Sequence, residues 1–328
     1  PIPSKGRTVN PTPTPTPTRP VEHIIEIPDL LHPKDLAINP NTHTMYVTSR
    51  NNDMVYAVDT LTEMVLAQIP VGDQPFGVAV NPNTNKIYVA CFRSGELYVI
   101  DGATHTVLKT IVVGPEACYV AVNPDTNRIY VTLHGLNGVA AINGATDTVI
   151  KWIGAGGAGT FGIAVNRNLN RIYISNRDVN SITTIDGATN KLIESQTIHL
   201  EPARSVPYTL AYNEVTQKLY IVYGPNKVWV YQATASGLTP LKSINIGYGG
   251  KDGGGGIVAN PNTNHIFVTN SAENTVTVIN GAADTVLTTL AMPTVGLDPF
   301  GIALDTATNI IYVGNRGSHN VSVIPDTF

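Results

Sequence analysis

Short segments in which apolar and polar residues alternate recur along the whole chain. In one repeat they cover residues 77–80, 86–90, 96–100 and 106–111, and they are rich in β-branched and aromatic residues. Alternation over about four to eight residues, bounded by Gly, Pro, Asn and Asp, is typical of β-strands. We therefore predict four short strands in each repeat.

One phrase marks the repeats, and it reads AVNPNTNKIYV at residues 79–89 and AVNPDTNRIYV at residues 121–131. Aligned on its aromatic residue, the phrase occurs seven times, at Tyr46, Tyr88, Tyr130, Tyr173, Tyr220, Phe267 and Tyr312. A period of about 42 to 47 residues is that of a propeller blade with four strands. The sequence thus predicts an all-β fold, a seven-bladed β-propeller of four-stranded antiparallel blades.

Two kinds of turn separate the strands. The first and second strands are joined by Asn-Pro-Asn-Thr-Asn or a close variant, in which Asn bonds its own backbone and Pro presets φ. The third and fourth strands are joined by Asp-Gly-Ala-Thr or Asn-Gly-Ala-Thr, as at residues 101–104 and 143–146. We expect the Gly of this turn to supply a positive φ.

The two ends of the chain predict how the ring closes. The seventh repeat has strand patterns at residues 301–304, 310–313 and 321–324, but no fourth one follows. Residues 23–28, upstream of the first repeat, align with the outermost strand. Because an open blade would leave an unpaired sheet edge, we predict that a strand at about residues 22–27 pairs with residues 321–324 and completes the last blade. The propeller domain is then residues 21–328.

The sequence motif Ile-Phe-Val-Thr-Asn at 266–270, with Ile-Tyr-Val-Gly-Asn at 311–315, resembles the YVTN family of β-propeller repeats. The resemblance covers residues 21–328, and the fifth repeat departs from it most, at 213–216 and 232–237. It implies a seven-bladed propeller of the kind common in secreted or surface-layer proteins of bacteria and archaea. It implies no shared catalytic activity.

Composition agrees with an extracellular or cell-surface location. Charged residues are only 13% of the chain, against an average of about 25%, and Thr and Asn together make about a fifth. The net charge of −4 gives no basic field for nucleic acid. No run of about 18 apolar residues predicts a membrane span. The first residues, Pro-Ile-Pro-Ser, fit a processed N-terminus.

Residues 1–20 form a second region, in which Pro and Thr alternate strictly from Pro11 to Thr18. Such a segment favours extended polyproline II at about 3.1 Å per residue, so 20 residues reach on the order of 60 Å. We expect an arm that docks on a neighbouring copy and builds a homo-oligomer, a filament or a surface lattice; the alternative is a semi-rigid tether. The predicted contact residues are Ser4, Lys5, Gly6, Arg7, Thr8, Val9, Asn10, Pro11, Thr12 and Pro13.

One face of the ring carries the candidate ligand residues. Arg50, Arg177 and Arg316 occupy the same position in repeats 1, 4 and 7, and Arg93 is displaced by one residue in repeat 2. They would form a cationic rim for a carboxylate, a phosphate or an acidic glycan, or each would pair with a local acid. Aromatic residues at the start of inner strands face the same mouth and would line a pocket or plug the channel as core: Phe76, Tyr119, Phe161, Tyr208 and Phe300.

Residues for catalysis do not converge in the sequence. Only His134 and His319 fall in the loops of this face, and the inner strands carry no acid in their bodies, with Asp35 and Asp298 at their entrances. The glycine-rich stretch 247–256 lacks the Gly-Lys-Ser/Thr ending of a phosphate loop. We predict a noncatalytic structural or adhesive protein with no metal and no cofactor, its partners being copies of itself and glycans or the cell surface. The alternative is a binding module or a lactonase-like enzyme.

The two cysteines, Cys91 and Cys118, fall on the same face of neighbouring repeats. A disulfide between them is geometrically feasible if their Cα atoms come within about 7 Å. The alternative is two independent small core residues. No Cys-x-x-Cys-His run indicates covalent haem.

Overall fold

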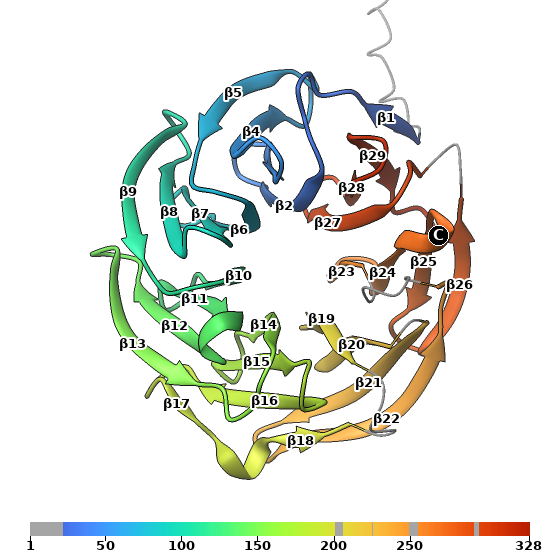
Figure 1. Ribbon diagram of the computed structural model, residues 1–328. Coiled ribbons are helices and arrows are strands. Elements are labelled where there is room, and N and C mark those ends of the chain that lie inside the picture. The colour runs from blue at the N-terminus through green and yellow to red at the C-terminus, as the bar shows by residue number, and fades with distance from the viewer. Residues whose placement is uncertain (1–21, 201–205, 225, 249–254, 292–294) are drawn as a thin grey trace, which may run out of the picture.

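The computed structural model describes residues 22–200, 206–224, 226–248, 255–291 and 295–328. Its seven antiparallel sheets stand around a common axis, one after the other along the chain (Figure 1). The prediction of an all-β, seven-bladed propeller is confirmed. Each sheet is one blade, and the first strand of each blade lies nearest the axis.

The first four blades follow in chain order. Blade 1 is β2 (Pro33–Asn39), β3 (Thr44–Ser49), β4 (Met54–Asp59) and β5 (Val65–Pro70), and blade 2 is β6 (Pro75–Asn81), β7 (Lys86–Cys91), β8 (Glu96–Asp101) and β9 (Thr106–Val112). Blade 3 is β10 (Ala117–Asn123), β11 (Arg128–Leu133), β12 (Gly138–Asn143) and β13 (Thr148–Gly154). Blade 4 is β14 (Thr160–Asn166), β15 (Arg171–Asn176), β16 (Ser181–Asp186) and an outer strand divided into β17 (Lys191–Leu192) and β18 (Ile198–His199).

The last three blades repeat the pattern. Blade 5 is β19 (Pro207–Asn213), β20 (Lys218–Tyr223), β21 (Lys227–Thr234) and β22 (Gly237–Asn245). Blade 6 is β23 (Ile257–Asn260), β24 (His265–Asn270), β25 (Thr275–Asn280) and β26 (Thr285–Leu290), and blade 7 is β27 (Pro299–Asp305), β28 (Ile310–Asn315), β29 (Asn320–Pro325) and β1 (His23–Ile25). Three short 3-10 helices lie in connections: η1 (His134–Leu136), η2 (Glu194–Gln196) and η3 (Ser271–Glu273).

The ring closes as the sequence predicts. Strand β1 pairs antiparallel with β29, with His23 opposite Val323 and Ile25 opposite Val321. Ile25 and Ile27 are buried in a cluster with residues of blades 1 and 7. The N-terminal strand therefore supplies the outer edge of the last blade and joins the two ends of the ring (Figure 1).

In four of the seven repeats, the tyrosine of the repeated phrase links its blade to the next. The Tyr220 hydroxyl lies 3.2 Å from the carbonyl oxygen of Gly281 and 2.8 Å from Asp284 Oδ1, both in the turn between the third and fourth strands of the following blade. Other tyrosines make the same kind of contact with the turn of the next blade: Tyr46, Tyr130 and Tyr312. Because these side chains are at most 1% exposed, the hydroxyl must find a partner inside the protein.

A second link joins the blades on the face opposite the candidate ligand residues. Asn39 Nδ2 donates to Oδ1 of Asn85 in the next blade at 2.7 Å. The same bond recurs at four other junctions, between Asn81 and Asn127, Asn123 and Asn170, Asn213 and Asn264, and Asn260 and Asn309. At the junction of blades 7 and 1 the residues are Asp305 and His43 instead, with Oδ2 and Nδ1 3.8 Å apart.

The expectation for the Asp-Gly turns is wrong in one respect. Gly102 does not have a positive φ; the positive φ lies three residues later, at His105. A Cβ on Gly102 would come within 2.2 Å of the Asn85 side chain. Glycine is needed there because two turns of the same blade approach each other closely.

The cysteines are free thiols, so the feasible disulfide is not formed. Cys91 ends β7 inside the cluster between blades 1 and 2, whereas Cys118 packs with Phe76 and Phe161 near the axis. The two side chains enter different hydrophobic clusters, and burial raises the pKa of each thiol to about 12. The structure thus agrees with the alternative to a disulfide, in which the two cysteines are independent small core residues.

The predicted arm at residues 1–20, with its contact residues 4–13, lies outside the described residues, as do residues 249–254 of the glycine-rich stretch. Docking of the arm on a neighbouring copy stays a prediction. In the part of the chain that the structure describes, no helix is long and apolar enough to cross a membrane.

Candidate functional site

An irregularity at the start of the inner strands builds the mouth of the ring. In six blades the pairing of the first two strands shifts register there, for example between Pro75 and Val78 of β6. Such a bulge bends the strand and re-aims side chains. The residue after the first position of each bulged strand is Lys34, Phe76, Cys118, Phe161, Tyr208 or Phe300.

The following residue is glycine in several blades, because adjacent inner strands nearly touch. A Cβ on Gly77 would lie 2.6 Å from the carbonyl oxygen of Cys118, and one on Gly162 would lie 2.1 Å from that of Tyr208. This close approach brings the neighbouring aromatic residues together at the mouth.

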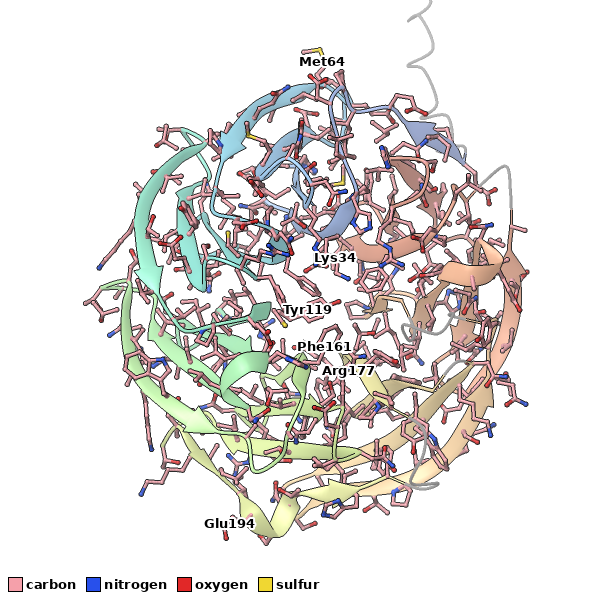
Figure 2. The ribbon with its side chains drawn as sticks, in the orientation of Figure 1. Lys34, Met64, Tyr119, Phe161, Arg177 and Glu194 are labelled. Carbon is pink, nitrogen blue, oxygen red and sulfur yellow. The ribbon has the colours of Figure 1, made fainter. Side chains whose placement is uncertain are left out.

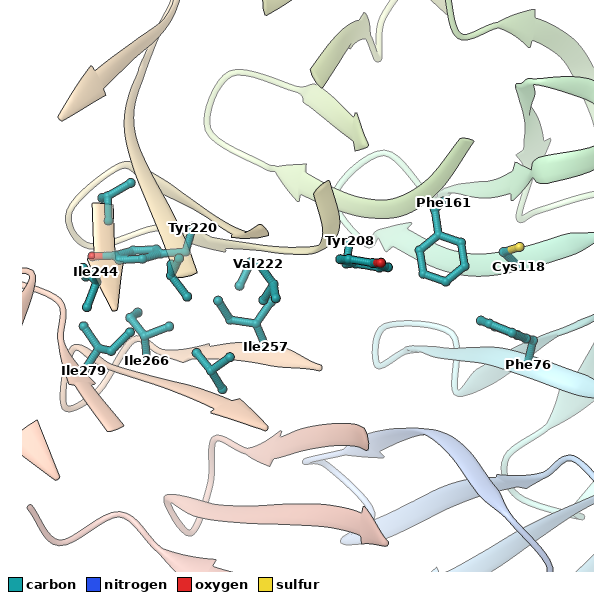
Figure 3. Close-up of a cluster of buried hydrophobic side chains, with 14 residues drawn as sticks. Phe76, Cys118, Phe161, Tyr208, Tyr220, Val222, Ile244, Ile257, Ile266 and Ile279 are labelled. Carbon is teal, nitrogen blue, oxygen red and sulfur yellow. The ribbon is translucent and has the colours of Figure 1, made fainter. Parts of the chain in front are cut away.

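Four of the five predicted aromatic residues form one connected cluster. The ring of Phe161 lies 5.9 Å from that of Phe76 and 6.3 Å from that of Tyr208, with Tyr119 at 5.2 Å from both phenylalanines, in edge-to-face arrangements. Figure 3 shows Phe76, Phe161 and Tyr208 side by side with Cys118. Phe76, Phe161, Tyr208 and Phe300 are 4–8% exposed. They are therefore core residues, and some of them also form the wall of a cavity.

That cavity, of about 350 Å³, opens at the mouth of the ring. Its volume is at the small end of the range for ligand pockets, about 300–1,000 Å³. Figure 2 shows Lys34, Phe161 and Arg177, which line it, near the centre of the ring. The lining residues are Lys34, Arg50, Phe76, Phe92, Glu116, His134, Phe161, Arg177, Phe300 and Arg316.

Three of the four predicted arginines line this cavity. Arg177 Cζ lies 4.6 Å from the ring centres of both Phe161 and Tyr208, so the guanidinium rests on aromatic faces. Arg316 likewise lies over Phe300, at 4.1 Å. Arg93 is exposed and is absent from the lining.

Only one of these three cations pairs with an acid. Arg316 Nη2 lies 2.7 Å from Asp298 Oδ1. Arg50 Nη2 instead donates to the neutral Gln74 Oε1 at 2.9 Å. Within the described residues Arg177 makes no ion pair, and its Nε is buried without a hydrogen-bond partner. Within the described ranges, the alternative in which each of these arginines pairs with a local acid therefore applies to Arg316 and not to Arg50 or Arg177.

Lys34 is a fourth cation of the cavity, and sequence reasoning missed it. Its side chain stands where four other blades have Phe or Tyr, and it is 5% exposed. Nζ lies 3.6 Å from the ring centre of Phe300 and 4.2 Å from that of Phe76. Burial, and then the charges of Arg316 and Arg50, hold the pKa of Lys34 well below its usual range. An alignment of the bulge positions would have shown a lone lysine among aromatic residues.

Two titratable residues, Asp35 and His32, lie close to Lys34 in the chain. Asp35 lines a second cavity of about 170 Å³ inside the ring, and its Oδ2 accepts the backbone N–H of Val78 at 3.0 Å. Burial raises the pKa of Asp35 to about 7. Burial, followed by the charge of Arg316, lowers the pKa of His32 to about 4.

One acid lines the mouth cavity. Glu116 Oε2 lies 2.7 Å from His134 Nδ1, so this carboxylate already has a partner. His319, the other predicted loop histidine, is not in the lining. Over the described ranges, no group of three or more His, Cys, Asp and Glu residues could hold a metal ion. The cavity therefore presents three arginines, and a fourth charge whenever Lys34 is protonated, against one paired carboxylate, an arrangement that attracts an anion.

No protein-family model and no curated protein matches the chain. Its fold is similar to a solved structure of hydrazine synthase from Kuenenia stuttgartiensis, with a TM-score of 0.80 and 19% identity over 91% of this chain and 97% of that one. It is also similar to the β-propeller domain of Cps50 (Swd1) from Myceliophteria thermophila, with a TM-score of 0.77 and 8% identity over 94% of this chain and 100% of that one. At such identities the similarity shows the fold alone: the chain is a seven-bladed β-propeller.

Proposed function

We propose that this propeller is a noncatalytic binding module that holds a small organic carboxylate in its mouth cavity. The observation that carries the proposal is the imbalance of charge in the lining, where three arginines, with the amine of Lys34 beside them, face one acid already paired with His134. Among the described residues, Lys34, Arg50 and Arg177 have no acidic partner within ion-pair distance. A bound carboxylate would supply that partner.

The size and shape of the cavity favour a small organic acid over a polymer. About 350 Å³ accommodates one small molecule. Guanidinium groups match a planar carboxylate through paired N–H donors. Because the aromatic faces of Phe161, Tyr208 and Phe300 already carry arginines, these cations are fixed in place before a ligand arrives, which reduces the entropic cost of binding.

A binding role fits the lining better than hydrolysis does. Among the described residues, the lining contains no Ser, Thr or Cys side chain that His134 could activate as a nucleophile. A lactonase-like reaction would call for a metal site, and the described residues bring together no such ligand group.

Isothermal titration calorimetry tests this proposal with lactate and succinate as probes and lactamide as the neutral control. We expect one carboxylate bound per chain, weaker binding as salt is raised, and no heat from lactamide. Equal binding of lactate and lactamide, or binding of neither, would contradict the proposal. The probe concentrations should extend into the millimolar range, because a single carboxylate offers few contacts.

A second candidate function is self-assembly outside the cell through the arm at residues 1–20. What supports it is the strict Pro-Thr alternation from Pro11 to Thr18, the low content of charged residues, 13%, and the resemblance of the repeats to YVTN surface-layer propellers. In this proposal, residues 4–10 add a strand to a neighbouring copy, because the prolines that follow cannot donate to a sheet.

Negative-stain electron microscopy and light scattering of the full chain, beside a variant lacking residues 1–20, test the assembly. Polymers formed only by the full chain would support it, and monomers from both proteins would refute it. The two proposals are independent, because the arm lies outside the described residues and the cavity does not require it.

A further inference from the structure

We propose that the ε-amine of Lys34 captures a small 2-oxo carboxylate covalently, as an imine, inside the mouth cavity. The inference rests on the proposed carboxylate site and adds a reacting atom to it. Within the described residues, Lys34 takes part in no ion pair and no hydrogen bond, although it is only 5% exposed. A buried lysine with no polar partner, lining a cavity, is unusual enough to call for a role.

The position of Nζ leaves one side of the nitrogen open. The ring centres of Phe300 and Phe76 lie 3.6 and 4.2 Å from it, and aromatic faces accept an ammonium charge or an N–H bond. When the amine is neutral, two N–H bonds can point at the two rings. Its lone pair then points away from both rings, and the residue lines the cavity.

The surroundings favour the neutral amine, which is the nucleophilic form. Burial is the main cause of the lowered pKa of Lys34, the charges of Arg316 and Arg50 act in the same direction, and Cys118 and Asp35 oppose them. Desolvation combined with a neighbouring cation is an established way of activating a lysine toward a carbonyl group.

Two shared rings hold the amine beside a carboxylate-binding group. Lys34 Nζ and Arg316 Cζ both lie over Phe300, at 3.6 and 4.1 Å. Lys34 and Arg50 share Phe76 in the same way, at 4.2 and 5.8 Å. A ligand whose carbonyl carbon is bonded directly to its carboxylate matches this pairing. Such a ligand is a 2-oxo carboxylate.

The reaction needs no oxidant or reductant. The Nζ lone pair attacks the carbonyl carbon, a C–N bond forms, and the carbonyl oxygen takes a proton to give a carbinolamine. The oxygen then takes a second proton, the C–O bond breaks and water leaves. Over the two steps the nitrogen gives up the two protons of the neutral amine, and the C=N bond forms. His134, hydrogen-bonded to Glu116 at 2.7 Å, lines the same cavity and can pass the proton to the departing oxygen.

Reductive trapping tests the inference on the full chain. The protein is incubated at neutral pH with pyruvate and sodium cyanoborohydride, which reduces an imine to a stable secondary amine, and the site is located by peptide mass mapping. We expect one attachment, at Lys34, at least about tenfold faster than at the exposed Lys109, because an ordinary lysine is almost wholly protonated at this pH. Lactate, which has a hydroxyl group where pyruvate has its 2-oxo group, cannot form an imine and should slow the labelling.

A pair of variants provides a matched control. Lys34→Met should abolish the fast attachment, whereas Lys218→Met should leave it, because Lys218 pairs with Asp284 at 2.7 Å in another blade junction. Peptide mapping of the labelled wild-type protein locates the attachment site without either variant. The result is therefore secure even if one of them folds poorly.

The possible outcomes separate this inference from the function on which it rests. If pyruvate and lactate bind equally well by calorimetry and no adduct forms at Lys34, the imine is refuted and the carboxylate site stands. If neither acid binds and no adduct forms, both are refuted. Labelling spread evenly over Lys34 and exposed lysines also overturns the inference, whereas fast labelling at Lys34 that lactate suppresses supports both.

Discussion

Replacement of Lys34 by methionine should stabilise the protein while it destroys the proposed site. The side chain is 5% exposed and has no acidic partner within ion-pair distance among the described residues. Removing an ammonium group from water costs several kcal/mol even after the protein relaxes. Functional sites often carry such a cost, since binding groups are retained at the expense of stability.

The size of the effect follows from the two ring contacts. The variant would lose two cation–π contacts, with Phe300 and Phe76, worth about 0.5–2 kcal/mol each. Methionine would recover about 0.3–1.5 kcal/mol for each sulfur–aromatic contact, and the cost of burying the charge would disappear. We therefore expect the free energy of unfolding to rise by about 1–3 kcal/mol.

The gain should depend on pH in a defined direction. The pKa of Lys34 is lowered in the folded protein. At pH values between this lowered pKa and the ordinary lysine pKa, the unfolded chain therefore binds more protons than the folded chain. The contribution of Lys34 to the stability of the wild type therefore becomes less unfavourable as the pH rises across this window. The advantage of Lys34→Met should be largest at low pH and shrink toward about pH 10.

Urea unfolding followed by tryptophan fluorescence at several pH values measures this difference. Lys218→Met is the control, because Lys218 has an acidic partner at 2.7 Å. Its loss should cost about 3–5 kcal/mol, as for other paired, largely buried charges. A loss of stability of more than about 1 kcal/mol in Lys34→Met would refute the reasoning, as would a difference that does not change with pH.

Three further predictions concern the frame around the site. Replacing both His43 and Asp305 by Asn should rebuild the Asn–Asn hydrogen bond that is found at five other blade junctions. The free energy of unfolding, measured in urea, should then rise by about 1 kcal/mol. Unchanged or lower stability would contradict the stabilising role of this bond between blades. Tyr220→Phe removes a hydrogen bond of 2.8 Å to a carboxylate and should lower the free energy of unfolding by about 1.5–3 kcal/mol in the same assay. Tyr46→Phe should lower it by less, because the Tyr46 hydroxyl has contacts of only 3.3 and 3.5 Å. The reverse order would contradict this account of the repeat. Burial raises the pKa of Asp35 to about 7, so the contribution of Asp35 to stability should fall from about pH 4 to pH 7. The stability of the wild type relative to Asp35→Asn should therefore decrease over this range, and parallel curves for the two proteins would contradict this role of Asp35.

The sequence predicts the ring and its closure because both follow from periodic features. The seven aromatic residues of the phrase fix the number of blades, and the missing outer strand of the seventh repeat predicts a closing strand at about residues 22–27. The structure has this strand at His23–Ile25. The divided outer strand of blade 4 was not predicted. There, β17 and β18 are separated by the 3-10 turn at Glu194–Gln196, where polar residues interrupt the alternation.

Part of the site could also be predicted. Arg50, Arg177 and Arg316 share one position in their repeats and meet at one cavity, while the displaced Arg93 does not reach it. Lys34 was missed because a lysine at the start of a strand is ordinarily exposed. Only the bulge, a departure from regular pairing, turns it onto two aromatic rings.

The most direct test of the carboxylate site compares two arginines on one rim. Arg50 lines the mouth cavity and Arg93 does not, so Arg50→Gln and Arg93→Gln remove the same charge from nearly the same place. Calorimetric titration of both variants with lactate should show binding at least about tenfold weaker in Arg50→Gln and nearly unchanged in Arg93→Gln. Equal weakening of both would mean that general charge, and not this cavity, attracts the anion, and would contradict the account.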